Sequence, residues 1–298
     1  MNLKYISDKI AYIPNPVNIG IIINNNSVIL IDSGIDDDTA KKILKTIEKN
    51  GLYPIALINT HSHADHCGGN SYLKNKTGLK IYAPEKESAL IENTMFEPYF
   101  FSSGARPPKE LENKFLKAKA SEVDTVIKEG IKDLSINGKT LEIVSLPGHA
   151  INQIGVFVDG ICFCADAYIQ RKILYRHKIP FNIDIEAQKE TLNFLLNTNY
   201  EYYLPAHGKL ASDAKEDIKV NLERILEIEN LILKFTNNDL SSEEIYLKVF
   251  DYYQLNINNL QKYYLNKTGI DAFLNYLLNL DKIRYNFKNN KMYWYNNG

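Results

Sequence analysis

The sequence of 298 residues lacks several features that would assign it to a large class of proteins. Neither sign of charge is in surplus, because 35 Lys and Arg stand against 36 Asp and Glu, so no general attraction to nucleic acid or to an anionic membrane is predicted. No uncharged apolar run is long enough to span a bilayer. The first nine residues are interrupted by charges and lack the apolar core of a signal peptide. These absences predict a cytoplasmic protein without a membrane partner.

Cysteine is scarce, and the three cysteines show no disulfide framework, which is typical of a reducing compartment. Cys162 and Cys164 alternate along one face of an apolar segment and are predicted to be small core residues. Cys67 lies next to a cluster of histidines, but the imidazole and carboxylate donors there are complete without it. We therefore expect no cysteine to bind a metal directly.

Histidine is also rare, yet three of the six histidines fall within one segment, His61-Ser-His63-Ala-Asp65-His66. Imidazoles at i and i+2, followed by a carboxylate and a third imidazole, present nitrogen and oxygen donors toward one point when the backbone curls. Zinc and similar divalent metals prefer such ligands. The short apolar segment 55–60 before them indicates a buried strand. The donors therefore follow the C-terminal end of a strand.

Three further donors, His149, Asp166 and His207, each lie in a turn-like setting after a short apolar segment. A fold that aligns these strand ends along one edge would gather five imidazoles and two carboxylates. The sixth histidine, His177, lies outside these settings. A lone histidine is more often a surface or core residue than a ligand.

This pattern resembles that of the metallo-beta-lactamase-fold hydrolases, in which His-x-His-x-Asp-His is followed by a distant His, an Asp and a final His. Every position of the pattern is filled. The resemblance implies two divalent metal ions, with zinc expected and iron or manganese accepted by the same donors. It assigns three ligands to the first metal, three to the second and a bridging role to one residue: His61, His63 and His149; Asp65, His66 and His207; and Asp166.

The likeness extends upstream to the apolar segment 28–31, which resembles an early strand of the family that ends in an aspartate behind the metal ligands. Asp32 occupies that position. It could merely begin a turn, because Asp-Ser-Gly is ordinary turn chemistry. We expect it instead to orient a ligand by hydrogen bonding.

The order of predicted elements favours an α/β fold with two sheets and helices outside them. This arrangement fits the four-layer αββα sandwich that the resemblance implies for residues 1–210. Residues 211–298 are expected to form a small, mainly helical domain similar to a winged-helix-like extension. Its predicted elements are a helix over 215–235, a helix that opens with the capping box at 241–244, a helix that follows Gly269 and runs through Leu280, and a hairpin over 283–295.

The resemblance implies hydrolysis. Two metal ions that share a water lower its pKa from ~15.7 toward about 7 and create a hydroxide nucleophile, which Asp65 would steer while it holds a metal. Oxygen-reducing diiron relatives carry a glutamate where this chain has His63, so hydrolysis is favoured over their redox chemistry. Relatives resembling hydroxyacylglutathione hydrolase match the complete ligand set, so a small-molecule thioester or lactone is the expected substrate. Lactonase relatives carry a tyrosine three residues after the bridging aspartate; Tyr168 lies two residues after it and is a candidate oxyanion donor.

Three alternatives stay open. Some relatives are ribonucleases or phosphodiesterases, and winged helices often bind nucleic acid. Residues 211–298 oppose this reading, because they contain 11 Lys or Arg and 12 Asp or Glu. Their nine tyrosines are expected to form a homodimer interface or to floor the active site rather than to stack on bases. A persulfide dioxygenase with one iron shares part of the pattern, and a binding protein that keeps its metal for stability is the third alternative.

Residues 91–122 interrupt the alternation of strands and helices. Five Met, Phe and Tyr residues crowd together at 95–101, ahead of a loop that contains Arg106. The segment is either a helix packed on the sandwich and followed by a loop, or an aromatic wall over the metals. We expect the wall, with Arg106 facing an anionic part of the substrate.

Overall fold

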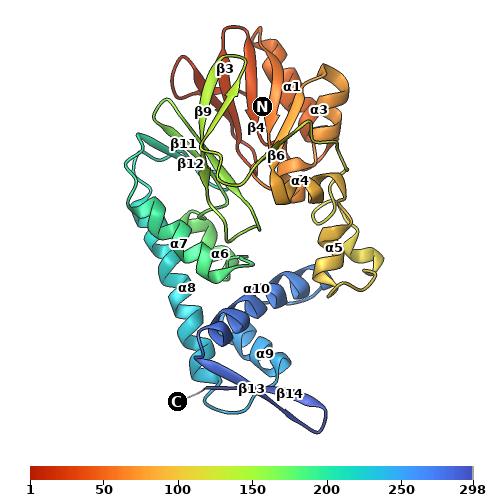
Figure 1. The fold of residues 1–298 in the computed structure, drawn as a ribbon, viewed down its shortest axis with the longest axis vertical. Coiled ribbons are helices and arrows are strands. Elements are labelled where there is room, and N and C mark those ends of the chain that lie inside the picture. Colours follow the sequence, from red (N-terminus) through yellow and green to blue (C-terminus); the bar gives the residue numbers. More distant parts are fainter. Residues whose placement is uncertain (297–298) are drawn as a thin grey trace.

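Two β-sheets packed face to face form the upper part of the molecule, and a helical unit extends from one end of them (Figure 1). The computed structural model describes residues 1–296. Residues 297–298, the end of the predicted second domain, lie outside the described residues. The order and direction of the strands decide which loops meet at the edge of the sandwich.

The first sheet contains seven strands, side by side in chain order: β1 (Lys4–Tyr5), β2 (Ile10–Ile13), β3 (Ile19–Asn24), β4 (Ser27–Ile31), β5 (Tyr53–Ile58), β6 (Lys80–Pro84) and β7 (Thr125–Ile127). Pairing is antiparallel from β1 to β4 and parallel from β4 to β7. The C-terminal ends of β4, β5 and β6 therefore lie at one edge.

The second sheet contains five strands: β8 (Asp133–Ile136), β9 (Lys139–Ser145), β10 (Ile154–Val158), β11 (Ile161–Ala165) and β12 (Tyr202–Pro205). Their spatial order is β12-β11-β10-β9-β8. Because β10 is antiparallel to both β9 and β11, and β12 is parallel to β11, the strands β9, β11 and β12 all run in one direction. Their C-terminal ends also share an edge.

Helices surround the sheets and build the unit below them. Those of the sandwich are α1 (Asp37–Lys49), α2 (Ala64–Cys67), α3 (Asn70–Thr77), α4 (Glu85–Glu92), α5 (Phe96–Phe101), the 3₁₀ helix η1 (Lys109–Leu111), α6 (Arg171–His177) and α7 (Ile185–Leu196). The lower unit contains α8 (Lys215–Phe235), α9 (Ser242–Tyr252), α10 (Leu260–Asn279) and the hairpin β13 (Ile283–Lys288) and β14 (Lys291–Asn296).

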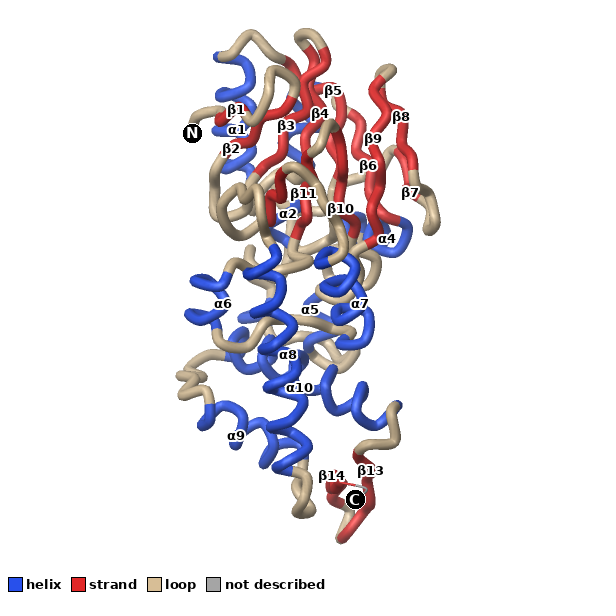
Figure 2. The backbone as a smooth tube through the Cα atoms, turned by 90° about the vertical axis from the view of Figure 1, so that its left-hand side faces the viewer, coloured by secondary structure: helices blue, strands red, loops and turns tan. Residues whose placement is uncertain are grey.

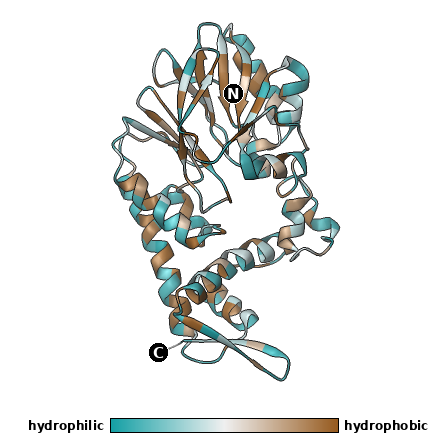
Figure 3. Ribbon diagram, in the orientation of Figure 1, coloured by the Kyte–Doolittle hydropathy of each residue, from teal (hydrophilic) through white to brown (hydrophobic). Residues whose placement is uncertain are grey.

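Alternating residues of β4 show how the layers form. Ile29 and Ile31 belong to the core between the two sheets, whereas Val28 and Leu30 pack against α1 and α3. Both faces of the strand are buried, which is why its sequence is apolar from Val28 to Ile31. Figure 3 shows hydrophobic residues concentrated on the strands of the sandwich. With α7 and α8 on the outer face of the second sheet, the predicted αββα sandwich is confirmed.

The helical unit shares a core with the sandwich. One cluster of buried residues joins Cys162, Cys164 and Tyr203 of the second sheet to side chains of α7, α8, α9, α10 and the hairpin. The cluster crosses the predicted boundary between residues 210 and 211 without interruption. Figure 2 shows α8 running down from the sandwich toward α9, with the hairpin at the far end.

The start of α10 corrects one prediction. The sequence places Gly269 before this helix, but the helix begins nine residues earlier, at Leu260, where the Asn259 side chain accepts a hydrogen bond from the Lys262 backbone N–H at 2.9 Å. Gly269 lies in the helix interior, where a Cβ would come no closer than 4.0 Å to the Pro180 carbonyl oxygen. The capping box of α9 is present as predicted, with Ser241 and Glu244 as its two members.

The segment 91–122 connects the sandwich to α10. Phe101, Leu111 and Leu116 form a small core cluster against Phe181 and residues of α10. Phe96 and Phe100 stack on each other in solvent instead. The segment therefore contains a helix followed by a loop, as in the first of the two predicted arrangements. Only part of its aromatic surface faces inward. Across residues 1–296, no helix is both long and apolar enough to cross a membrane.

Candidate metal centre

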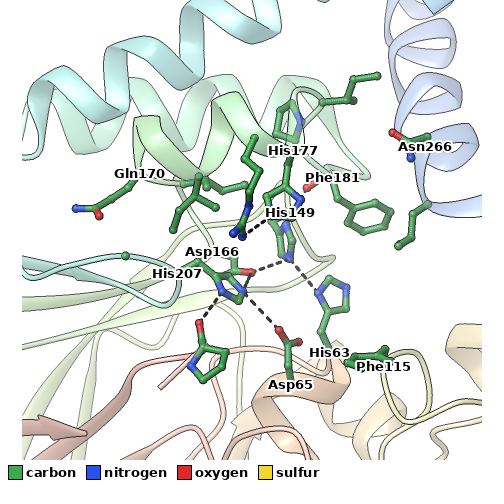
Figure 4. Close-up of a pocket in the computed structure, with 18 of the residues that line it drawn as sticks. His63, Asp65, Phe115, His149, Asp166, Gln170, His177, Phe181, His207 and Asn266 are labelled. Atoms are coloured by element: carbon green, nitrogen blue, oxygen red, sulfur yellow. Dashed lines mark hydrogen bonds and ion pairs between the residues drawn. The ribbon is translucent and has the colours of Figure 1, made fainter. Parts of the chain in front are cut away.

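The C-terminal ends of four strands deliver seven donor side chains to one point at the edge of the sandwich. β5 leads into the segment 61–66, β9 into His149, β11 into Asp166 and β12 into His207. Figure 4 shows His63, Asp65, His149, Asp166 and His207 gathered at the base of a pocket. The structure thus brings together every donor that the sequence pattern identified.

Three imidazoles form the first group. His61 Nε2 lies 3.1 Å from His63 Nδ1, which lies 2.9 Å from His149 Nε2. All three ring nitrogens point at a common centre, within 4.8 Å of one another. His61 is fully buried, and His149 is 7% exposed. This arrangement matches the ligand set that the resemblance gives to the first metal.

A carboxylate and two imidazoles form the second group. Asp65 Oδ2 lies 3.4 Å from His207 Nε2, and Asp65 Oδ1 lies 3.9 Å from His66 Nε2. His66 is fully buried, whereas the side chain of Asp65 is 35% exposed. The second group is therefore open to the pocket through Asp65.

Asp166 lies between the two groups. Its Oδ2 atom is 3.3 Å from His149 Nε2, 3.7 Å from His66 Nε2 and 3.5 Å from His207 Nε2. Asp166 also forms a third donor group with His61 and His66. Asp166 therefore lies within reach of imidazoles of both groups, and its role as a bridge between two metal ions stays a prediction.

Outer hydrogen bonds orient the imidazoles. Asp32 accepts hydrogen bonds from the Thr60 backbone N–H and hydroxyl, both at 2.9 Å, and its Oδ2 lies 2.8 Å from His66 Nδ1. His149 Nδ1 lies 2.8 Å from the Phe181 carbonyl, and His207 Nδ1 lies 2.8 Å from the Pro16 carbonyl. A ring that donates from Nδ1 keeps the Nε2 lone pair available for a metal. Asp32 thus has contacts of the kind predicted for it.

Burial keeps the first group neutral at physiological pH. It lowers the pKa of His61 well below the ordinary 6.5. Burial and the charge of His149 lower the pKa of His63 to about 3, and burial likewise lowers the pKa of His149. Neutral imidazole is the form that binds metal.

The second group is strongly coupled to its carboxylates. Burial opposes ionisation of Asp65, but His66 and His207 bring its pKa to about 2. Burial would lower the pKa of His66, but Asp32 and Asp166 raise it well above 6.5. The charge of Asp166 raises the pKa of His207 to about 10. Metal binding to this group must therefore displace protons from its histidines.

The residues fit a pair of divalent cations. Among residues 1–296, the buried atoms His66 Nε2 and Asp166 Oδ1 have no hydrogen-bond partner, and such atoms cost free energy unless something satisfies them. The surrounding nitrogen and carboxylate donors suit zinc, iron or manganese. Cys67 belongs to none of the donor groups; its thiol donates to the Ser62 carbonyl at 3.1 Å.

The pocket over these donors has a volume of about 860 Å³ and lies between the sandwich and α10. Phe115, Leu116 and Phe181 are among its apolar lining residues, and Leu265 and Asn266 come from α10. The C-terminal unit therefore contributes a wall of the site. The sequence allows this possibility through the tyrosines of the unit, but none of them lines the pocket.

Two predicted substrate contacts lie elsewhere. Arg106 is exposed in the loop after α5 and does not line the pocket, whereas Phe115 and Leu116 further along the same segment do. Tyr168 is 1% exposed and packs in the core with α7 and α8. Its position two residues after Asp166 directs it into the core and away from the pocket. Both predictions are corrected by the structure.

Four cations in the pocket wall were not identified from the sequence. They are Lys172, Arg176, Lys209 and Lys262, and are referred to below as the wall cations. None of them forms an ion pair with a carboxylate of residues 1–296, and His177 lies beside Arg176 in the same wall. In the sequence they are single basic residues without a pattern. The apolar spacing of α6 gives the only local signal that Lys172 and Arg176 share a helix face.

The αββα sandwich and the two adjoining groups of imidazole and carboxylate donors at its strand ends place this chain in the class of metallo-hydrolases. A family model described as "Metallo-beta-lactamase superfamily" matches residues 12–207. The chain belongs to this superfamily, and it is a metal-dependent hydrolase.

Its similarity to curated proteins is limited to part of their length. The chain is 26% identical over 179 residues to the probable metallo-hydrolase YqgX of Bacillus subtilis (strain 168), covering 60% of this chain and 76% of that protein. It is 29% identical over 144 residues to a hydroxyacylglutathione hydrolase of Klebsiella pneumoniae subsp. pneumoniae, covering 48% of this chain and 43% of that protein. For the corresponding enzyme of Serratia proteamaculans (strain 568), the identity is 23% over 133 residues, with coverage of 44% and 40%. The chain thus spans less than half of these hydroxyacylglutathione hydrolases.

Solved structures show the same fold. A metallo-beta-lactamase family protein from Thermus thermophilus superposes with a TM-score of 0.72 at 14% identity, covering 96% of this chain and 97% of that chain. A beta-lactamase domain protein from Burkholderia ambifaria gives a TM-score of 0.73 at 14% identity, with coverage of 99% and 94%. FEZ-1 from Legionella gormanii covers only 76% of this chain, with a TM-score of 0.61 at 16% identity. The first two likenesses therefore extend over the helical unit.

Proposed function

We propose that this chain uses two divalent metal ions, with zinc the expected metal, to hydrolyse a thioester or a lactone of a small molecule. The observation that carries the proposal is the pair of donor groups with Asp166 between them, within 3.3–3.7 Å of imidazoles of both groups. A single metal ion would need only one of these groups. The curated hydroxyacylglutathione hydrolases among its relatives support ester-like substrates.

When bound, two such ions supply a shared water of lowered pKa and a Lewis acid for the substrate oxygen. Of the two donor carboxylates, Asp65 is the more open to the pocket, because its side chain is 35% exposed whereas that of Asp166 is 9% exposed. Asp65 can therefore accept or direct a proton at Oδ1 or Oδ2 as the substrate is attacked. Asp32 and the Phe181 and Pro16 carbonyls hold the imidazoles in place meanwhile.

The wall cations support a substrate with an anionic group. They lie in the same pocket wall as apolar residues such as Ile173 and Leu265, so an amphipathic anion has complementary surfaces there. The scissile bond would lie over the donors, with the anionic group directed toward α6 and α10. This role replaces the one expected of Arg106.

The same cations favour a second candidate, hydrolysis of a phosphodiester such as that of RNA. The charge of residues 211–298 is balanced, with 11 basic and 12 acidic residues, and this balance favours the small-molecule reaction. A homodimer and a cytoplasmic location stay predictions from the sequence.

One experiment tests the proposal: elemental analysis of freshly purified protein, followed by turnover assays with thioesters, lactones, phosphodiesters and glutathione persulfide. We expect two metal ions per chain and hydrolysis of an anionic thioester or lactone in preference to its uncharged ester analogue. One iron per chain with oxygen uptake on persulfide would identify a dioxygenase instead. Salt-sensitive cleavage of single-stranded RNA would favour the nuclease, and no turnover by metal-loaded protein would favour a binding protein.

A further inference from the structure

A buried glutamate connects the two loops that carry the first group of imidazoles. Glu87 lies in the first turn of α4, directly after β6, and is fully buried. Its Oε2 accepts a hydrogen bond from the Ser62 backbone N–H at 3.0 Å, and its Oε1 accepts one from the Asn152 backbone N–H at 2.8 Å. Glu87 forms no ion pair with a Lys, Arg or His within residues 1–296.

These two amides occupy positions that matter for the metal centre. Ser62 lies between His61 and His63, and Asn152 lies three residues after His149 in the loop that follows β9. The three imidazoles of the first group come from these two loops and from nowhere else. One carboxylate therefore joins the loop of His63 to the loop of His149. The His63 Nδ1 and His149 Nε2 atoms of these loops lie 2.9 Å apart.

A carboxylate suits the two contacts. Only an ionised carboxylate offers two acceptor oxygens and no donor, so it can accept from both amides at once. A buried carboxylate without a cation is costly unless its oxygens are hydrogen-bonded. Two backbone N–H donors and the N-terminal turn of α4 offset this cost. Two separate neutral acceptors could satisfy the amides, but they would not tie one loop to the other.

We propose that Glu87 is a positioning residue that fixes the spacing of His61, His63 and His149 by holding both of their loops through one carboxylate. The inference rests on the proposed role of these imidazoles as a metal site. It also predicts selectivity, because no residue of the second group is hydrogen-bonded to Glu87. His66 in that group is held by Asp32 instead.

Glu87→Gln tests the proposal with little change of volume. The glutamine oxygen accepts one amide, but its NH₂ group then faces the other backbone N–H. Stepwise Zn²⁺ affinities, measured by competition with a chromogenic chelator, should fall about 10–100-fold for one ion and stay unchanged for the other. The visible spectrum of the Co²⁺-loaded variant should change, and amide exchange at Ser62 or Asn152 in the metal-free protein should accelerate.

Glu85→Gln is the matched control, because Glu85 lies two residues away on α4 and its carboxylate contacts only exposed residues such as Lys128. It should leave both Zn²⁺ affinities and both amides unchanged. If Glu87→Gln does not fold, the same measurements are made on Glu87→Asp. This variant keeps the negative charge, but its side chain is one methylene shorter, so its oxygens lie farther from the two amides.

Three results would overturn the proposal. One is a variant with a lowered melting temperature but wild-type affinity for both ions, which would make Glu87 only structural. Another is an equal loss of affinity for both ions, which would remove the selectivity. The third is unchanged exchange at both amides. A wild-type chain that binds fewer than two ions counts against the proposed function, whereas amide exchange in the metal-free variant still tests the contacts of Glu87 separately.

Discussion

Among single residues, Asp32 supports the second group from behind: it accepts from Thr60 twice, and its Oδ2 lies 2.8 Å from His66 Nδ1. Its backbone has a φ of +63°, a conformation that Asn tolerates as well as Asp. Asp32→Asn should therefore keep the turn but lose the negative charge behind His66. We expect binding of one metal ion, the one held by His66, to weaken about 10–100-fold in the chelator competition.

Asp159→Asn is the control for this change. Asp159 also has a positive φ, of +47°, but it lies on the surface paired with Lys139. Its substitution should leave both metal affinities unchanged. Wild-type metal binding by Asp32→Asn would show that the Asp32 carboxylate only shapes its turn.

The seven donors could be predicted from the sequence because their types and spacing are rare together, as in the segment 61–66. Their outer partners could not. The Phe181 and Pro16 carbonyls are backbone atoms, so side-chain identity gives no sign of them. Glu87 gives no signal either, because an acidic residue in the first turn of a helix is ordinary. Tyr168 was misplaced because spacing alone does not give the direction of a side chain.

Short elements at the centre depend on close packing. The φ of Gly68, at the end of α2, is −62°, so any residue could adopt its backbone conformation. A Cβ there would nevertheless lie 2.0 Å from the Ile35 carbonyl oxygen. Gly68→Ala must therefore move α2, which carries Asp65 and His66. We expect a loss of roughly 1–3 kcal/mol in the free energy of unfolding, measured in urea, together with weaker metal binding.

Gly269→Ala provides the comparison, because Gly269 lies inside α10 with free space around it. There alanine should stabilise the chain by about 0.5–1 kcal/mol through helix propensity. If Gly68→Ala behaved like Gly269→Ala, the close approach of α2 to Ile35 would have no energetic consequence.

The wall cations of α6 and α10 give a prediction for substrate binding. Arg176→Gln and Lys262→Gln should each raise KM for an anionic substrate about 2–5-fold, as expected from roughly 0.5–1 kcal/mol for an exposed ion pair. The value of kcat should stay the same, because neither residue belongs to a donor group. Lys219→Gln, on α8 outside the pocket lining, should change neither constant. An equal effect on an uncharged ester would argue against charge recognition.

Most strands were predictable at this scale because a segment such as β4 is apolar over four consecutive residues, from Val28 to Ile31, and is flanked by turns. The beginning of α10 was not, because Gly269 resembles a helix boundary in sequence. The true N-terminus depends on the Asn259 side chain, in a stretch rich in Asn where several residues could serve as a cap.

Over the whole molecule, the lower unit is joined to the sandwich by buried polar contacts as well as by the shared core. Glu229 of α8 is 5% exposed and contacts Lys189 of α7 at 3.0 Å and Lys282 at 2.8 Å. Lys189 also donates to the Tyr276 hydroxyl of α10 at 2.9 Å. Because residues of α10 such as Leu265 and Asn266 line the pocket, this network helps to fix the width of the pocket.

The network should make stability depend on pH. Burial would raise the pKa of Glu229, but its hydrogen bonds with Lys282 and Lys189 lower it below the ordinary 4.5. A carboxyl group with a depressed folded-state pKa stabilises the fold above its unfolded pKa, and this contribution is lost as the pH falls through the folded value. Glu229→Gln should therefore lower the melting temperature at pH 7, with roughly 1–3 kcal/mol lost.

Below a pH of about 4.5 the difference between wild type and Glu229→Gln should shrink, because the wild-type carboxyl group also becomes neutral there. Other carboxylates titrate in the same range, so the difference between the two melting curves is the quantity to follow from about pH 3 to about pH 8. Glu223→Gln, on the same helix but outside this network, should give a curve parallel to wild type. A parallel curve for Glu229→Gln as well would mean that α10 is held by apolar packing alone. In that case the pocket width would not depend on this charge.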